Sequence, residues 1–199
     1  MLTAIKEAHP FTPPRKRLTR GDCAVLQMAG QLDYQRHELI DGDLIEKMPK
    51  NWTHTYALII LQAWLAQVFG PLFVAQEAPI NVSPEDNPTS EPEPDLVVFK
   101  RPASEFTTPK RSPGELSLVI EVSDTTLQFD KKIKAALYAR AGITEYWVFD
   151  INGRRLGVHR DPRGGEYESV AWFGEKERVE PLAAPGQKFL ISSAFNPAP

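Results

Sequence analysis

The sequence predicts one mixed α/β domain, with a mixed β-sheet flanked by helices, an N-terminal hairpin and extra C-terminal strands. Two observations favour this class. Residues 116–122 form a nearly continuous apolar run, which is typical of a strand buried on both faces. A helical pattern and a second apolar run, residues 145–149, follow it. This order is that of a βαβ crossover, so we expect the two strands to be parallel neighbours.

The bulk composition is that of a folded protein, with 42% apolar and 25% charged residues in a chain of 199. The net charge of -3 argues against a protein that holds nucleic acid by bulk charge alone, although it allows a local basic groove. The single cysteine, Cys23, excludes an intrachain disulfide and a Cys-based zinc site. Without a secretory signal or a membrane-length apolar stretch, we expect a cytoplasmic protein with no membrane partner.

The N-terminal region is expected to hold an arm, a helix and a hairpin. Residues 1–20 are rich in proline and basic residues and predict a flexible arm, either solvated or in contact with phosphate or a partner. A single domain is expected over 21–193, followed by a loose tail at 194–199. A helix is predicted at residues 22–29, around Cys23. Two apolar segments flank Asp41 and Gly42, a dipeptide that tolerates the positive φ of a hairpin turn.

The strongest helical pattern spans residues 51–69, which Asn51 or Thr53 can cap and Gly70 ends. Extended segments are predicted at 72–82, 95–99 and 116–122, with a basic loop at 100–114. A second helix is predicted at 127–141, because Gly142 is a natural stop. The remaining expected strands are residues 145–149, 155–159, 167–173 and 189–191.

Two carboxylates stand apart from the solvated charges. Asp95 opens a strand after a Pro-rich stretch, and Glu121 lies near the end of an apolar strand. A carboxylate in such a place is costly to desolvate unless it is paired or binds a cation. Two of them on neighbouring strands could share one Mg²⁺, which favours carboxylate, backbone oxygen, water and phosphate ligands. The alternatives are a turn acid at Asp95 and a salt bridge at Glu121.

The helix after Glu121 is rich in lysine. Its predicted apolar face consists of Phe129, Ile133, Ala136 and Leu137. At 100° per residue, Lys131 points to solvent, while Lys132 and Lys134 flank the buried face on opposite sides. Geometry alone does not choose between Lys132 and Lys134. The alternative is that all three lysines are solvated, with Asp130 and Lys134 as an i,i+4 ion pair.

Several motifs occur together in one order: His37 to Gly42, Pro94-Asp95, Glu121-Val-Ser-Asp124, Asp130-x-x-x-Lys134-x-x-x-Tyr138 to Ile143, and Glu145 to Asp150. This ordered set resembles the Uma-two family, bacterial proteins classed as restriction-endonuclease-like nucleases. The resemblance covers about residues 18–159. Each motif alone is weak, but the ordered set is specific.

The resemblance implies the PD-(D/E)XK fold, with Asp95 and Glu121 holding Mg²⁺ or Mn²⁺ and the Val122 backbone carbonyl as a further ligand. In the parent pattern a lysine sits two residues after the acid, where this chain has Ser123. The resemblance places the lysine on the following helix, at Lys134. It therefore implies a metal-dependent endonuclease that hydrolyses phosphodiester bonds of DNA, with Lys134 assisting the attacking water.

The other candidate residues carry weaker signals. Accessory positions that could border the site are Glu38, Glu46, His54 and Tyr138; candidates for phosphate contact are Lys100, Arg101, Lys110 and Arg111. Core packing and loop solvation explain the same residues. The competing functions are an inactive nucleic-acid- or protein-binding domain of the same fold and a hydrolase of another phosphoester. A homodimer would suit double-strand cleavage.

Overall fold

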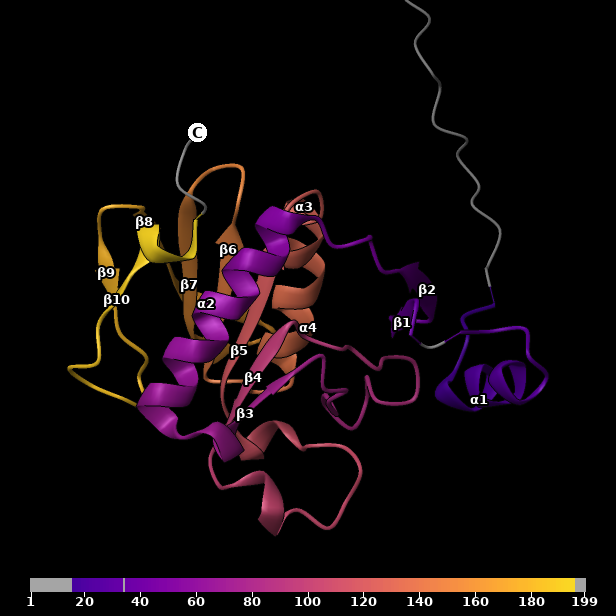
Figure 1. Cartoon of the computed structure of the whole chain (residues 1–199). Helices are drawn as coiled ribbons and strands as arrows, with labels where there is room; N and C mark the ends of the chain where they lie inside the picture. Colours follow the sequence, from indigo (N-terminus) through magenta and orange to yellow (C-terminus); the bar gives the residue numbers. More distant parts are fainter. Residues whose placement is uncertain (1–15, 34, 196–199) are drawn as a thin grey trace, which may run out of the picture.

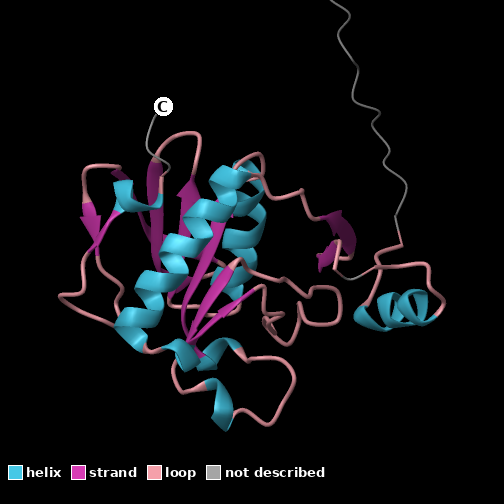
Figure 2. Cartoon of the chain, in the orientation of Figure 1, coloured by secondary structure: helices cyan, strands magenta, loops and turns pink. Residues whose placement is uncertain are grey.

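The computed structural model describes residues 16–33 and 35–195. Its centre is one six-stranded sheet in the order β3-β4-β5-β6-β7-β8 (Figure 1). The strands are β3 (Val74–Gln76), β4 (Leu96–Phe99), β5 (Leu116–Ser123), β6 (Glu145–Asp150), β7 (Arg155–Arg163) and β8 (Glu166–Gly174). The other elements are α1 (Arg20–Met28), β1 (His37–Ile40), β2 (Asp43–Glu46), α2 (Trp52–Phe69), α3 (Leu127–Phe129), α4 (Ala135–Arg140), β9 (Arg178–Val179) and β10 (Phe189–Leu190) (Figure 2).

The sheet is mixed, as predicted. Strands β5 and β6 are parallel, and every other pair in this sheet is antiparallel. The helical segment from α3 to α4 forms the crossover between the two parallel strands. The βαβ unit and the mixed α/β class predicted from the apolar runs are therefore confirmed.

Helices cover both faces of the sheet, so the domain has three layers (Figure 1). Helix α2 packs on one face through Ala57, Leu58, Leu61 and Leu65. Helix α4 packs on the other face through Ala135, Tyr138 and Ala139. Because side chains alternate along a strand, β5 sends Ile120 and Val122 toward α2 and Val119 toward α4. Glu121 has the same parity as Val119 and therefore faces α4.

The N-terminal hairpin forms as predicted. Strands β1 and β2 are antiparallel, and the turn residues Asp41 and Gly42 have φ of 48° and 81°. Thr19 caps α1 with its side chain in a capping box with Asp22. Arg20, which falls in the predicted arm, is the first residue of α1 and hydrogen-bonds Ser90 O. Residues 1–15 of the predicted arm lie outside the described part of the chain.

Two segments differ from the expected elements. The extended segment at 72–82 contains a strand of only three residues, β3, because Leu72 and Phe73 lie in a 3-10 turn before it and Glu77, after it, adopts a left-handed φ of 50°. At the C-terminal end, Ala194 and Phe195 fall in the predicted tail but are buried in the core beside Phe149. None of the helices in the described ranges is long and apolar enough to cross a membrane.

A buried histidine in β7 should make stability depend on pH. His159 is 3% exposed, and its ring lies 5.3 Å from that of Tyr146. Burial lowers the pKa of His159 from 6.5 to about 4. Between these values the unfolded chain binds the proton and the folded chain does not, so stability falls as the pH falls from 6.5 to 4. The loss should reach about 3 kcal/mol.

We expect His159→Gln to remove this part of the pH dependence. Urea unfolding of both proteins at several pH values measures it, because other acid-titrating groups are shared and cancel in the difference. Parallel stability curves for the two proteins between pH 4 and 6.5 would show that the histidine does not carry the effect.

Candidate functional site

A cleft of about 160 Å³ opens at the end of the sheet where β4 begins and β5 ends. Its walls come from the β1–β2 hairpin, the linker between β2 and α2, the first turn of α2 and the start of the α3–α4 helix. Leu96 pairs with Ile120, so the preceding residue, Asp95, lies opposite Glu121. The two carboxylates singled out by the sequence therefore meet at this cleft.

Asp95 is held by the neighbouring strand and by α2. Its Oδ2 accepts a hydrogen bond of 2.8 Å from the Val122 backbone N–H, and His54 Nε2 lies 3.5 Å from the same oxygen. Its Oδ1 lies 3.9 Å from Lys50 Nζ. Burial raises the pKa of Asp95, but His54, the Val122 N–H and Lys134 outweigh it and lower the pKa. Asp95 is therefore an ionised carboxylate at neutral pH.

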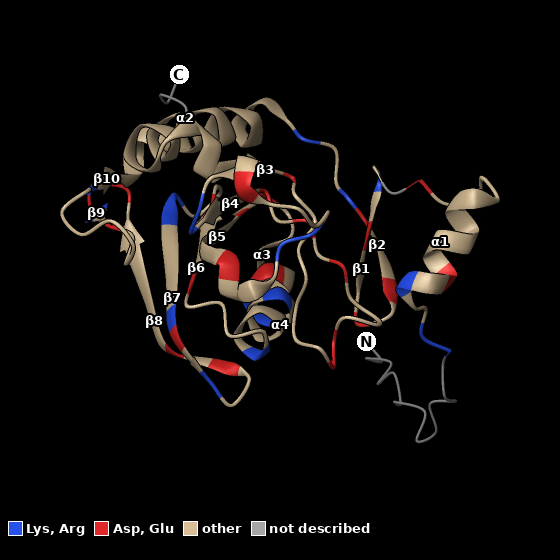
Figure 3. Cartoon of the chain, turned by 90° about the horizontal axis from the view of Figure 1, so that it is seen from below, with Lys and Arg blue, Asp and Glu red and all other residues tan. Residues whose placement is uncertain are grey.

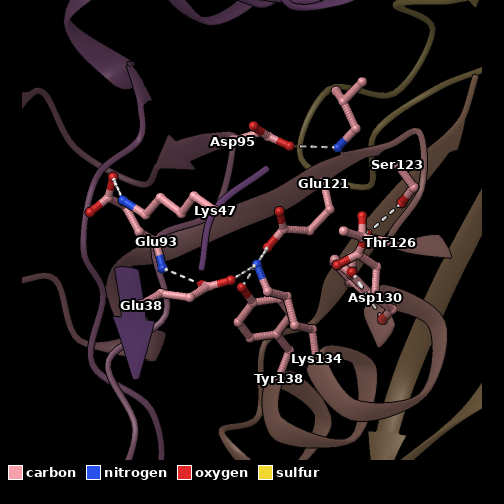
Figure 4. A network of polar contacts seen from close by, with 12 residues as sticks. Glu38, Lys47, Glu93, Asp95, Glu121, Ser123, Thr126, Asp130, Lys134 and Tyr138 are labelled. Carbon is pink, nitrogen blue, oxygen red and sulfur yellow. Dashed lines mark hydrogen bonds and ion pairs between the residues drawn. The ribbon is translucent and has the colours of Figure 1, made fainter. Parts of the chain in front are cut away.

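Glu121 is the centre of a buried polar cluster (Figure 4). Its Oε1 accepts from Lys134 Nζ at 2.9 Å and from Tyr138 OH at 2.8 Å. Lys134 Nζ also contacts Glu38 Oε1 at 2.8 Å. Burial raises the pKa of Glu121 far above its usual value, and Lys134 opposes this shift only in part.

Lys134 keeps its charge in this cluster. Burial alone would lower the pKa of Lys134, but Glu121, Glu38 and Asp130 raise it well above its usual value. The cluster thus holds one fixed ammonium group between two carboxyl groups at the base of the cleft.

A π-helical turn directs the Lys134 side chain toward the sheet and Glu121. Residues Asp130–Lys134 form this turn, and the Ala135 N–H donates to Asp130 O, five residues back. The extra residue rotates the helix relative to an ideal α-helix. Ile133 is therefore 42% exposed and Lys134 is 5% exposed. The predicted apolar face, which included Ile133, is wrong at that position. Lys132 is exposed, so the structure places Lys134 and not Lys132 against Glu121.

Ser123 occupies the place of the lysine in the parent pattern, and it has a structural role. Its Oγ donates to Asp130 Oδ2 at 2.7 Å, and Thr126 Oγ1 donates to the same oxygen at 2.6 Å. Asp130 is buried, which raises its pKa. The predicted alternative of a solvated Asp130–Lys134 pair is therefore wrong, because both side chains lie inside.

Three of the four accessory candidates reach the cluster. Lys134 is contacted by Glu38, and Asp95 by His54. The hydroxyl group of Tyr138 donates a hydrogen bond to Glu121. Glu46 lies on the opposite face of the hairpin from Glu38, since Glu38 pairs with Ile45 and Glu46 with His37. Its carboxylate accepts from Arg36 at 2.7 Å.

The basic loop 100–114 joins β4 to β5 at the end of these strands away from Asp95 and Glu121 (Figure 1). Three of its four candidates have partners: Glu115 for Arg101, Glu91 for Lys110 and the Phe106 ring for Arg111. Lys100 is exposed. The predicted phosphate-contacting role of these residues thus gains no support from their placement.

Other residues of the cleft had no signal strong enough to find them in the sequence. Asp124 accepts from Asn51 Nδ2 at 2.5 Å and from Asn152 Nδ2 at 2.9 Å. Asn51 in turn caps α2 by accepting from the His54 N–H. Asp124 therefore fastens the first turn of α2, and with it His54, to the end of β5. The sequence indicated the cap at Asn51 and placed Asp124 in a motif, but it did not predict the contact between the two residues.

The sheet, its flanking helices and the carboxylates at one end of it define a nuclease-like α/β protein. Residues 24–192 match the family model described as "Uma2: Putative restriction endonuclease", and the chain belongs to this family. The chain is also similar to a solved structure from Anabaena variabilis ATCC 29413, described as "a putative nuclease belonging to DUF820". The TM-score is 0.62 and the identity 17%, over 84% of this chain and 94% of that one.

No curated protein matches the chain significantly. At 17% identity the solved structure carries the fold alone, so the predicted family rests on the family model. The predicted family and fold class are both confirmed. The roles of individual side chains stay predictions.

Proposed function

We propose that the protein is a divalent-metal-dependent nuclease that hydrolyses phosphodiester bonds of DNA. The observation that carries the proposal is the meeting of Asp95 and Glu121 on paired strands, beside the buried ammonium group of Lys134. Membership of the Uma2 family supports a nucleic acid as the substrate.

The residues of the cleft fit Mg²⁺ or Mn²⁺ in their chemistry. Asp95 Oδ1 and Glu121 Oε2 are the oxygens left over by the hydrogen bonds to Val122, Lys134 and Tyr138. The N–H and C=O of a strand residue point to the same side, so the Val122 carbonyl faces the same edge as its N–H. Mg²⁺ takes one or two carboxylates and completes its shell with water and phosphate oxygens.

The charge of the cleft also favours a cation. Three lysines line it, Lys47, Lys50 and Lys134, against seven acidic residues besides Glu46, whose carboxylate pairs with Arg36: Glu38, Glu77, Glu93, Asp95, Glu121, Asp124 and Asp130. A phosphodiester would be repelled from such a cleft unless further positive charge accompanied it. Among the described residues, no three His, Cys, Asp or Glu side chains form a ready-made metal cage, so water and substrate oxygens would supply the remaining ligands.

Asp95, Glu121 and the Val122 carbonyl would hold the ion, which supplies Lewis-acid polarisation of the phosphate and hydroxide at neutral pH. Lys134 keeps a positive charge at the base of the cleft, where it can orient the attacking water and stabilise negative charge that develops on the phosphoryl oxygens. Tyr138 fixes Glu121, and His54 lies beside Asp95.

The test is cleavage of labelled DNA and RNA, each as duplex and single strand, with Mg²⁺ or Mn²⁺. We expect cleavage of DNA that EDTA abolishes and that Asp95→Asn reduces by about 100-fold or more. The control is Lys132→Gln, which should leave cleavage unchanged, because Lys132 is exposed on the helix that carries Lys134. DNA binding without turnover would favour the inactive binding domain, and cleavage in EDTA would exclude the metal-dependent mechanism.

A further inference from the structure

A second lysine reaches the candidate site from the linker 47–51, which joins β2 to α2. Lys50 Nζ forms an ion pair with Glu77 and lies 3.9 Å from Asp95 Oδ1. This is the oxygen of Asp95 that the Val122 N–H does not engage. Figure 3 shows basic positions on the linker from β2 to α2 and acidic positions on neighbouring segments. Lys50 thus faces the part of Asp95 that is turned toward the cleft.

The three lysines of the cleft differ in what they can do. Lys134 is buried and held by two carboxylates. Lys47 pairs with Glu93 at 2.6 Å. Lys50 has a side chain that is 32% exposed, and it combines access to solvent with contact to a predicted metal ligand. Since its ammonium group is a point charge on a flexible stem, it can exchange a carboxylate for a phosphate with little rearrangement.

The partner of Lys50 is held in an unusual backbone conformation. Glu77 has a φ of 50°, which costs a non-glycine residue about 1 kcal/mol. Its backbone N–H donates to Asp95 O at 3.2 Å, so the residue is fixed to the start of β4. A strained backbone conformation of this kind persists only where contacts with the surrounding structure hold it, and such residues are common at functional sites. In this position the Glu77 carboxylate pairs with Lys50, which also lies near the Asp95 carboxylate.

We propose that Lys50 binds a phosphate of the nucleic acid next to the Asp95–Glu121 pair, and that Glu77 holds the ammonium group in the free protein. This inference rests on the proposed nuclease function and adds the residue that recognises the substrate backbone. The competing explanation is that Lys50 only balances the charges of Glu77 and Asp95.

The test is binding of a short fluorescein-labelled DNA duplex, measured by fluorescence anisotropy over a series of salt concentrations. Ca²⁺ serves as the hard cation, and a gel confirms that the duplex stays intact. Each phosphate contact contributes about 0.9 to the slope of log affinity against log salt. We expect Lys50→Gln to weaken binding by about 5- to 10-fold and to lower the slope by about one. Lys176→Gln, an exposed lysine between β8 and β9, is the matched control and should change neither.

A second variant separates recognition from charge balance. Glu77→Gln removes the competing partner, so we expect tighter binding, and this gain should disappear in the Lys50→Gln background. If Lys50 only balanced charge, the gain from Glu77→Gln would be the same in both backgrounds, and the slope would not change in Lys50→Gln. Either result would overturn the inference.

The two proposals can fail separately. A wild-type protein that neither binds nor cuts the duplex would overturn the nuclease function and this inference with it. A wild-type protein that cuts the duplex, with Lys50→Gln binding as well as wild type at every salt concentration, would overturn the inference alone.

Discussion

Lys134→Met is expected to destabilise the protein by about 3 to 5 kcal/mol and to remove nuclease activity. The substitution keeps the length of the side chain but leaves Glu38 and Glu121 buried without their shared ammonium group. Breaking a buried ion pair from one side costs more than the pair itself contributes, because the remaining charges lose both solvent and partner. Urea unfolding measures the loss, and Lys132→Met, on the solvent side of the same helix, should change stability by less than about 0.5 kcal/mol.

The loss should be smaller in acid. The pKa of Glu121 is already raised by burial, and removal of Lys134, which opposes that shift, raises it further. A carboxyl group with a raised pKa in the folded state binds its proton more tightly when folded, so the variant gains stability as the pH falls toward the unfolded value of 4.5. A loss that stays the same from pH 7 to pH 5 would contradict the assignment of Glu121 as the uncompensated charge.

Activity and stability can be separated with a double variant. Glu38→Gln added to Lys134→Met removes one of the two carboxylates that have lost their ion pair with Lys134. Part of the lost stability should therefore return, while cleavage stays absent. Recovery of cleavage in the double variant would show that Lys134 acts only by holding the fold.

The sequence was most informative at positions where the free-energy cost of burying a charge outweighs other effects. A carboxylate inside an apolar strand is expensive, so Glu121 stood out, and the paired strands then brought Asp95 opposite to it. The apolar run of β5 and the crossover after it were equally plain, because burial on both faces leaves little choice of residue.

The orientation of Lys134 could not be predicted from periodicity. An ideal helix places Ile133 on the buried face, but the π-helical turn at Asp130–Lys134 rotates the helix and buries Lys134 instead. Tertiary contacts determine this turn, because Lys134 can form its ion pairs with Glu38 and Glu121 only after β1 and β5 have packed against the helix. Only the family resemblance pointed to Lys134, the lysine that the structure places against Glu121.

Contacts between distant segments were also out of reach. Lys50 and Glu77 are 27 residues apart and meet only because α2 spans the sheet between them. The basic loop 100–114 shows the opposite problem: its charges suggested phosphate contacts, but three of the four candidates are engaged with Glu115, Glu91 and Phe106. The sequence shows which residues are charged, but it does not show which residues they contact in the folded protein.

Calorimetric titration with Mn²⁺ is expected to show saturable binding to the wild-type protein and no binding to Asp95→Asn or Glu121→Gln. Each amide removes one of the two carboxyl groups on which a Mg²⁺-type site depends. Bound metal should also stabilise the wild type by about 2.7 kcal/mol when the free ion is at 100 times its dissociation constant. Thermal unfolding with and without Mn²⁺ measures this gain, which both variants should lack.

Without metal, the two variants should differ in stability. Burial raises the pKa of Glu121, so folding favours its neutral form relative to the unfolded chain, and a glutamine can still accept from Lys134 and Tyr138. The pKa of Asp95 is lowered, so the folded protein favours its charge, and an asparagine forfeits that interaction. We therefore expect metal-free Glu121→Gln to be at least as stable as Asp95→Asn. If both variants bind Mn²⁺ as wild type does, the ion binds elsewhere in the protein, and Asp95 and Glu121 are not its ligands.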